Sequence, residues 1–158
     1  MPTVRLQQAQ FDPGAEQSGF LRGQSAAGAA VTFTGIVRSD ADDPLVSLTI
    51  EHFEALADSE IGRIVEDACQ RFRLIDVLVI HRYGRMEAGE AIMQVTTLAS
   101  HRQEAFAAAE FLMDYLKTGA PFWKKEERAS GDRWVEATNK DRSAVERWTS
   151  EPTVRAAQ

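Results

Sequence analysis

Two segments of the chain carry apolar residues at intervals of three and four positions. The first spans about residues 58–72 and the second about residues 100–118. This spacing places the apolar side chains on one side of a helix, so each segment is predicted to be a helix with that side against a core. A shorter helix is expected to begin after Asp12, with Pro13 in its first turn, and to end before Gly23. Another is expected near residues 143–148.

The remaining patterned segments are short and rich in β-branched and aromatic residues, which is typical of strands. Asp40–Pro44 separates two of them, and these two are predicted to pair as a long hairpin. Tyr83–Glu90, which contains two glycines, is predicted to be a turn between two further strands. The expected strands span residues 3–9, 28–37, 46–53, 75–81, 91–99, 121–127 and 133–137.

The order of these elements predicts an α+β fold, with helices packed on one face of a mostly antiparallel sheet. A chain of 158 residues with 44% hydrophobic residues is long enough to bury a substantial core. Residues 1–150 are therefore predicted to form a single domain. The last residues show no periodicity, and residues 151–158 are expected to be a frayed tail.

The formal net charge of −6 makes the chain as a whole unsuited to binding a nucleic-acid backbone. Positive charge is instead local, in a segment that begins at the end of the second long helix. A basic pocket on an acidic protein suits a small anionic ligand or the acidic tail of a partner. The basic residues of this segment are Lys117, Lys124, Lys125, Arg128 and Arg133.

Cysteine and histidine, which commonly hold metals or carry sulfur, are sparse in this chain. Cys69 is the single cysteine, so an internal disulfide and a cysteine-rich metal site are excluded. It lies beside the apolar side of a predicted helix, and an inert, half-buried thiol is expected. The histidines His52, His81 and His101 are too dispersed to indicate a zinc site, and the first two are expected to be structural.

The apolar segments of the sequence do not match known targeting signals. The first residues lack the apolar segment of a signal peptide, and no run of apolar residues is long enough to span a bilayer. A cytoplasmic protein is therefore predicted.

The start of the second long helix indicates an anion site. Ser100 and Gln103 match a capping box, which would place His101 and Arg102 in the first helical turn. Cationic side chains at this end oppose the helix dipole by roughly 0.3–1 kcal/mol. An anionic ligand bound by these side chains and the free backbone N–H groups would explain them. The alternative is an exposed pair that nearby carboxylates neutralise.

The end of the same helix carries a second candidate group. Lys117 is followed by Gly119, which suits a left-handed cap, and by Pro121, which stops the helix. In the strand that follows, Phe122 and Lys124 would share one face. Lys124 could then lie close to Lys117, and each amine would lower the pKa of the other. The alternative is that Lys117 only stabilises the negative end of the helix dipole.

Five segments match those of a known family in the same order: VTFTGIVR at 31–38, VIHRYG at 79–84, SHR at 100–102, MDYLKTGAPFWKKE at 113–126 and GDRWVEA at 131–137. Together they resemble the large, catalytic subunit of molybdopterin synthase over about residues 28–148. The resemblance implies an α/β-hammerhead-like fold with a small additional β subdomain. It also implies an enzyme of molybdenum cofactor biosynthesis that transfers sulfur to cyclic pyranopterin monophosphate and so forms the dithiolene of molybdopterin.

The resemblance further implies the partners. The sulfur comes from the C-terminal thiocarboxylate of a ubiquitin-like small subunit, and the large subunit itself binds no cofactor and no metal. Two large subunits form a homodimer with one small subunit at each end, giving a heterotetramer. This agrees with the acidic surroundings of Cys69, beside Glu66 and Asp67, which do not favour a sulfur-carrying thiolate.

The family resemblance assigns roles to residues already singled out. It implies that Lys117 and Lys124 are the catalytic pair, acting on protons or developing negative charge. It also implies that some phosphate contacts reach across the dimer. Phe33 and Met113 are candidates for apolar walls or plain core residues, and Arg133 is a weaker candidate because Asp132 could neutralise it. The expected phosphate-binding residues are Arg38, His101 and Arg102.

Two other functions compete with this interpretation. A dimeric module could bind a phosphorylated metabolite without chemistry, which would not require the two lysines to lie together. A phosphoryl-transfer enzyme is disfavoured, because the chain has neither a GxxxxGK[ST] loop nor a compact set of carboxylates for magnesium.

Overall fold

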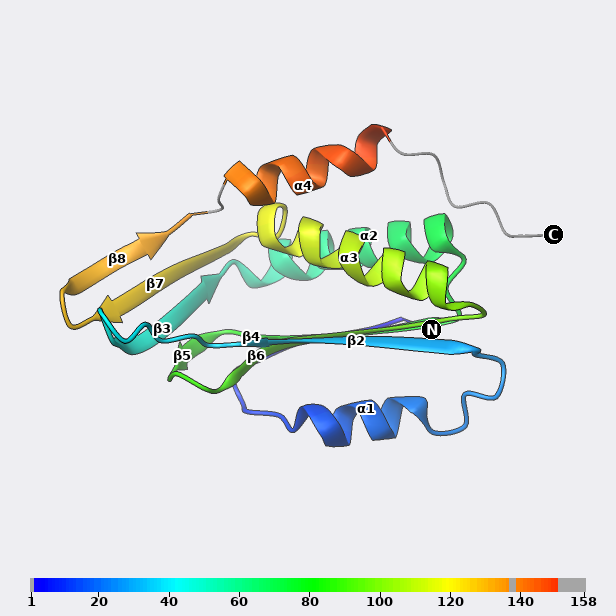
Figure 1. Cartoon of the computed structure of the whole chain (residues 1–158), viewed down its shortest axis with the longest axis horizontal. Coiled ribbons are helices and arrows are strands. Elements are labelled where there is room, and N and C mark those ends of the chain that lie inside the picture. The colour runs from blue at the N-terminus through cyan, green and yellow to red at the C-terminus, as the bar shows by residue number, and fades with distance from the viewer. Residues whose placement is uncertain (1, 137–138, 151–158) are drawn as a thin grey trace.

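The computed structural model describes residues 2–136 and 139–150 (Figure 1). The expected frayed tail at 151–158 and the end of the last expected strand, residue 137, lie outside the described residues. Eight strands and four helices fill the described part, and the predicted α+β class is confirmed. No helix among the described residues combines the length and the apolar character needed to cross a membrane.

The larger sheet, sheet A, combines segments from both halves of the chain. Its one parallel pair joins the first strand to β4 at the sheet edge, and the other pairs are antiparallel. The two central strands, β4 and β6, are nearly completely buried. In spatial order, sheet A consists of β1 (Thr3–Gln7), β4 (Asp76–Arg82), β6 (Ala91–Ala99) and β2 (Ala29–Ile36).

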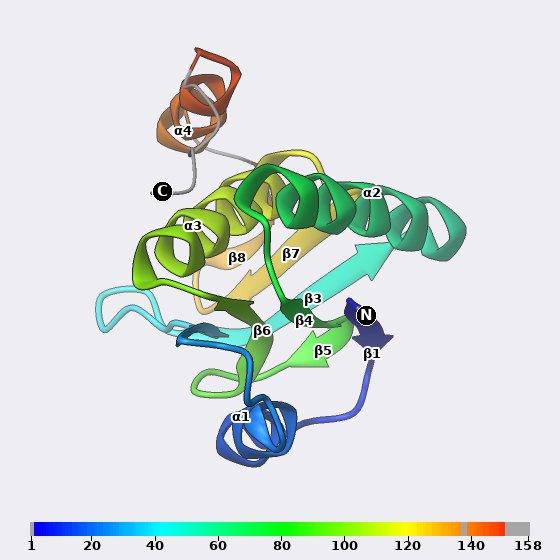
Figure 2. The ribbon, with the colours of Figure 1, turned by 90° about the vertical axis from the view of Figure 1, so that its right-hand side faces the viewer.

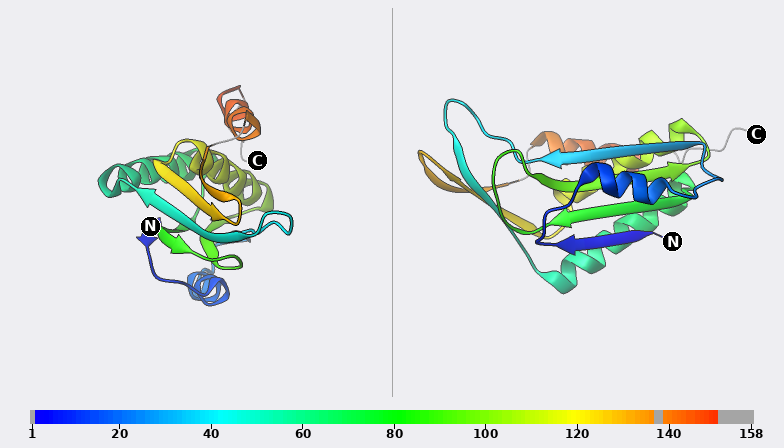
Figure 3. Two further views of the ribbon diagram at one scale, coloured as in Figure 1. Left: turned by 90° about the vertical axis from the view of Figure 1, so that its left-hand side faces the viewer. Right: turned by 90° about the horizontal axis from the view of Figure 1, so that it is seen from below.

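The smaller sheet, sheet B, is antiparallel throughout and extends beyond the helices (Figures 1 and 3). The predicted hairpin between 28–37 and 46–53 is wrong, because the second of these strands leaves sheet A and pairs in sheet B. One strand was missed inside the expected Tyr83–Glu90 turn. In spatial order, sheet B consists of β5 (Gly84–Met86), β3 (Leu45–His52), β7 (Phe122–Arg128) and β8 (Gly131–Val135).

The helices cover both faces of sheet A rather than one. Figures 1 and 2 show α2 and α3 on one face, α1 on the other, and α4 against the outer side of α3. The expectation of a single covered face is wrong because α1, which buries no residue of its own, lies over polar groups of the sheet such as Gln94. The helices are α1 (Pro13–Leu21), α2 (Glu54–Phe72), α3 (Arg102–Thr118) and α4 (Asn139–Ser150).

Local capping explains where the first helix begins. The Asp12 carboxylate accepts hydrogen bonds from the backbone N–H groups of Gly14 (2.9 Å) and Ala15 (3.1 Å), with Pro13 in the first turn. This satisfies two of the backbone donors that a helix leaves unpaired at its start. The predicted start of α1 is therefore confirmed.

Two separate cores meet at the boundary between the sheets. The larger core lies between sheet A and the helices α2 and α3, and the smaller one belongs to sheet B. Ile92 and Phe122 pack against both. The first residue of β7 is thus held at the junction of the two sheets, which determines where the rest of that strand lies.

A tryptophan holds the last helix against the larger core. Trp148 is 5% exposed and packs edge-on against Phe72 and Phe111, with centroids 5.8 and 5.4 Å away. Its indole N–H donates to a carboxylate oxygen of Asp114 at 2.7 Å. Burial of an aromatic ring together with a satisfied N–H is a strong local attachment.

A substitution at Gly28 tests how closely the backbone before β2 approaches the backbone at Ser100. A Cβ at this position would lie 2.1 Å from the carbonyl oxygen of Ser100, so Gly28→Ala requires the backbone to move. We expect this variant to lose about 1–3 kcal/mol of unfolding free energy in urea denaturation. Gly19→Ala is the matched control, since nothing lies within 4 Å of the added methyl group and the site is helical. It should be neutral or more stable by up to about 1 kcal/mol. Equal stability of the two variants would contradict the close contact at Gly28.

Candidate functional site

Two lysines from neighbouring elements line one pocket at the junction of the sheets. Lys117 lies in the last turn of α3 and Lys124 in β7. Both line a cavity of about 250 Å³ and an adjoining one of about 320 Å³. The predicted approach of the two amines is confirmed.

The alternation of β7 explains how Lys124 reaches this pocket. Trp123 is exposed, whereas Phe122 and Lys124 face inward, as the strand pattern predicted. Lys124 lies opposite Ile50 in the register with β3, and Ile50 belongs to the smaller core. The amine is therefore carried on a strand face that is otherwise apolar at this point.

Burial and a like charge make Lys124 an unusual amine. Desolvation lowers its pKa, and the positive charge of Lys117 lowers it further. The carboxylate of Asp141 acts in the opposite direction. Within the described part of the chain, neither lysine forms an ion pair, so their charge is available to a ligand. Such an amine can bind an anion, and it releases its proton more readily than an ordinary lysine.

The 250 Å³ cavity has apolar walls. Phe33, on β2, is 39% exposed, and Met113 lies on α3 one turn before Lys117. Both residues line the cavity, so the structure places them where an apolar wall was expected. Whether they contact a ligand stays a prediction. The lining residues are Phe33, Thr34, Gly35, Ile36, His81, Ile92, Met93, Met113, Leu116, Lys117 and Lys124.

The adjoining 320 Å³ cavity carries charges of both signs. Arg38, which follows β2 and is exposed, lines it together with the two lysines. Glu136 and Asp141 line it as well. Glu136 directly follows β8, and Asp141 lies in the first turn of α4. The sequence did not indicate these two carboxylates, because tertiary packing decides which distant residues reach the cavity.

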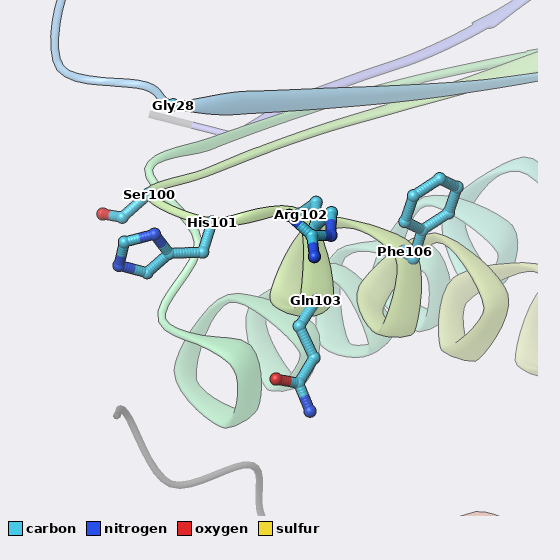
Figure 4. Close-up of a pocket in the computed structure, with 6 residues that line it drawn as sticks. All are labelled: Gly28, Ser100, His101, Arg102, Gln103 and Phe106. Atoms are coloured by element: carbon cyan, nitrogen blue, oxygen red, sulfur yellow. The ribbon is translucent and has the colours of Figure 1, made fainter. Parts of the chain in front are cut away.

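The second expected anion site lies at the other end of α3. Its N-cap is His101, with an extended backbone (φ −133°, ψ 156°) and no side-chain capping hydrogen bond. The predicted capping box of Ser100 and Gln103 is therefore wrong, because the helix begins at Arg102. In Figure 4, Gln103 points away from Ser100, on the opposite side of α3 from Arg102 and Phe106.

The residues around the start of α3 line an open hollow of about 700 Å³. Phe106 belongs to the helix whose apolar side was expected to face the core, but it is 62% exposed and lines this hollow beside His101 and Arg102 (Figure 4). Lys117 follows Arg102 by 15 positions in α3, which correspond to about 22 Å along the helix axis. His101 and Arg102 thus form one group and Arg38 belongs to another, so one chain does not bring the three expected phosphate ligands together.

Two local expectations near the lysines are wrong. Gly119 has a right-handed backbone (φ −99°, ψ −22°), not a left-handed one, and its N–H donates to the carbonyl of Tyr115 at 2.7 Å. Arg133 pairs with Glu126 (3.1 Å), whereas Asp132 pairs with Lys125 (3.6 Å). Strand pairing between β7 and β8 decides these partners, and sequence adjacency does not.

The other reactive groups of the chain lie apart from the lysines. Cys69 is half-buried against the larger core, and burial, with Asp76 and Glu66 nearby, raises the pKa of its thiol. A raised pKa disfavours the thiolate, in agreement with the expected inert thiol. No group of three potential metal-ligating side chains occurs among residues 2–136 and 139–150.

His81 was taken as structural, but the structure places it in the wall of the lysine pocket. It is 3% exposed and stacks on Phe122, with centroids 4.0 Å apart and planes 8° from parallel. Burial lowers its pKa to about 4. Its place within the VIHRYG segment was the available signal, although nothing in that segment shows which surface the ring lines.

The fold and the paired lysines define a class: an α+β protein that presents a partly buried basic pocket to a small or terminal anion. Comparison with known proteins is more specific. The family model described as "MoaE protein" matches residues 6–119, and the chain belongs to this family. The resemblance inferred from the sequence is therefore confirmed.

Individual relatives agree with this assignment. The molybdopterin synthase catalytic subunit of Cereibacter sphaeroides is 53% identical over 145 residues, which cover 92% of this chain and 99% of that protein. The solved "Molybdopterin biosynthesis MoaE protein" of Burkholderia ambifaria has a TM-score of 0.80 and 40% identity, covering 96% of this chain and 100% of that one. A Helicobacter pylori chain, solved as a complex of subunits 1 and 2 of molybdopterin-converting factor, shares the fold with a TM-score of 0.70, 19% identity and coverage of 87% and 91%.

The electrostatic coupling of the two lysines is open to direct measurement. In Lys117→Gln the neighbouring positive charge is gone, so we expect the pKa of Lys124 to rise towards its ordinary value while remaining lowered by burial. The measurement is a pH titration of the side-chain resonances in protein labelled with ¹³C-lysine. Lys125→Gln is the matched control, since Lys125 pairs with Asp132 instead. An unchanged titration of Lys124 in Lys117→Gln would show that the two amines do not interact.

Proposed function

We propose that this chain is the catalytic subunit of a molybdopterin synthase, which transfers sulfur to cyclic pyranopterin monophosphate in molybdenum cofactor biosynthesis. Family membership supports the reaction, and the names of its relatives carry that activity. The observation that carries the residue assignment is the pair of lysines in one pocket with apolar walls. The sulfur source is the C-terminal thiocarboxylate of a small partner subunit, and the chain itself supplies no cofactor.

The two lysines suit the charges of this reaction. A thiocarboxylate is an anion, and a pocket with two ammonium groups and few competing ion pairs attracts it. The lowered pKa of Lys124 also makes it a better proton donor than an ordinary lysine. In this proposal, Lys117 and Lys124 hold the terminal thiocarboxylate beside the pterin and stabilise the negative charge that develops as sulfur is transferred.

The position of the pocket suits the C-terminal tail of a partner subunit. The pocket lies at the junction of the two sheets, between the end of α3 and β7. An extended C-terminal tail can reach such a site while the body of the partner stays on the surface. The complex of two subunits solved for the Helicobacter pylori protein supports assembly with a small subunit.

The substrate phosphate requires a second copy of this chain. His101 and Arg102 lie about 22 Å of helix away from Lys117, beyond the reach of one small substrate, and a rigid helix cannot bring its own ends together. A homodimer that places the α3 start of one protomer near the lysine pocket of the other would assemble a complete site. Arg38 already lines the lysine side of that composite site. The argument for a dimer is that α3 holds the two groups of cations too far apart for one substrate to contact both in the same protomer.

A non-catalytic module that binds a phosphorylated metabolite is the remaining candidate. It would use the cations at the start of α3 but would not need the apposed lysines. The lowered pKa of Lys124 favours the catalytic proposal over this one.

Reconstitution tests the activity and the lysine together. Purified chain is mixed with thiocarboxylated small subunit and cyclic pyranopterin monophosphate, and molybdopterin is measured as its fluorescent oxidised derivative. We expect product from the wild type and a loss of about 10²–10⁴-fold in Lys117→Ala. Lys125→Ala should retain activity, because it faces away from the pocket. Full turnover by Lys117→Ala would favour the binding module, and no product from the wild type would reject the proposed reaction.

Mixed dimers test the composite site. Lys117→Ala and Arg102→Ala remove groups from opposite halves of one proposed site, so each variant alone should be inactive. After the two variants are unfolded and refolded together in equal amounts, about half of the dimers are mixed and each contains one intact site, so about a quarter of wild-type activity should return. Mass spectrometry of the refolded mixture confirms that mixed dimers are present. No recovery in their presence would place both residues in the same protomer's site.

A further inference from the structure

Of the described residues that line the 250 Å³ cavity, His81 is the only one whose side chain is a ring with nitrogen atoms. Its Nδ1 lies 2.8 Å from the carbonyl oxygen of Arg82. A carbonyl only accepts hydrogen bonds, so Nδ1 carries the proton and donates it to this contact. In the neutral ring, Nε2 is then an unprotonated acceptor.

No described residue donates a hydrogen bond to that Nε2, although the side chain is only 3% exposed. Nε2 is not among the fully buried side-chain atoms that lack a partner in the described part of the chain, so it is open to a ligand in the cavity. The ring is fixed by its stack on Phe122 and by the Arg82 carbonyl, so it cannot turn to find another partner. Nε2 is therefore a preorganised acceptor in a cavity whose other walls are mostly apolar or cationic.

The surrounding charges keep this acceptor uncharged. Lys124 from β7 and His52 from β3 both lower the pKa of His81, after burial, and Lys117 of α3 lines the same cavity. The strands that pair with β4 place Leu6 and Met93 opposite His81, and neither carries a charge. With a pKa of about 4, the ring stays neutral throughout the neutral range.

We propose that His81 is a substrate-recognition residue: its Nε2 accepts a hydrogen bond from an uncharged N–H or O–H group of the ligand, while the lysines take the anionic group. The inference rests on the proposed function for the site and adds a requirement to it. The ligand must present a neutral hydrogen-bond donor, of the kind found on a nitrogen heterocycle, within the cavity. A simple anion does not satisfy this requirement.

Three substitutions separate the two ring nitrogens. His81→Asn retains a donor near Nδ1 for the Arg82 carbonyl but has no acceptor at the position of Nε2. His81→Gln reaches the position of Nε2 and can present its carbonyl oxygen there. His81→Phe keeps the stack on Phe122 and removes both nitrogens. His52→Asn is the matched control, because His52 also neighbours Phe122 but does not line the cavity.

The measurement is the dissociation constant of cyclic pyranopterin monophosphate for each folded variant, by calorimetry, with thermal stability recorded in parallel. We expect binding to weaken about 10–100-fold in His81→Asn and in His81→Phe, since a buried donor on the ligand loses its partner. His81→Gln and His52→Asn should stay within about 3-fold of the wild type. Inorganic phosphate, as a second probe, should bind all variants alike.

A spectroscopic readout isolates the hydrogen bond from any structural effect. In ¹⁵N-histidine protein, the Nε2 resonance of His81 should be that of an unprotonated nitrogen, and substrate should shift it while phosphate does not. Unchanged substrate binding in His81→Asn and His81→Phe, with wild-type binding intact, would overturn this inference and leave the proposed function standing. Equal weakening in His81→Gln together with lower stability in all three variants would also overturn it, in favour of a structural role. Failure of the wild type to bind the substrate would instead reject the proposed function.

Discussion

The stack of Phe122 on His81 is the contact on which the site depends. Phe122 begins β7 directly after the turn that follows α3, and it packs against the cores of both sheets. Side chains two positions apart in a strand point to the same face. Once the Phe122 ring is fixed, Lys124 therefore points into the pocket that Lys117 also lines. A packing contact between two aromatic rings thereby decides the distance between two charged groups.

That arrangement has an electrostatic cost. Two amines share a pocket whose walls are largely apolar, and neither is neutralised by an ion pair among the described residues. The pKa of Lys124 falls as a result, which relieves part of the repulsion and creates a group able to exchange protons. Other cations of sheet B do form ion pairs, as Arg133 and Arg128 do with Glu126 and Lys125 does with Asp132. Because Lys117 and Lys124 lack such partners among the described residues, their positive charges can attract an anionic ligand into this pocket.

The sequence by itself determined the elements whose signals are local. Apolar periodicity located α2 and α3, the Asp12–Pro13 pair located α1, and strand alternation placed Phe122 and Lys124 on one face of β7. Each of these depends on neighbours within a few positions, which is why one sequence was enough. Family resemblance then supplied the function, because its motifs were continuous in the chain.

Only the tertiary structure decided which distant segments meet. It paired β3 with β7 instead of β2, placed α1 on the opposite face of sheet A, and set Arg38 apart from His101. It also changed the interpretation of His81 from a structural residue to a neutral acceptor in the pocket wall. The physical reason is the same in each case: strand partners, burial and pKa depend on contacts between residues far apart in the chain, and no local pattern records them.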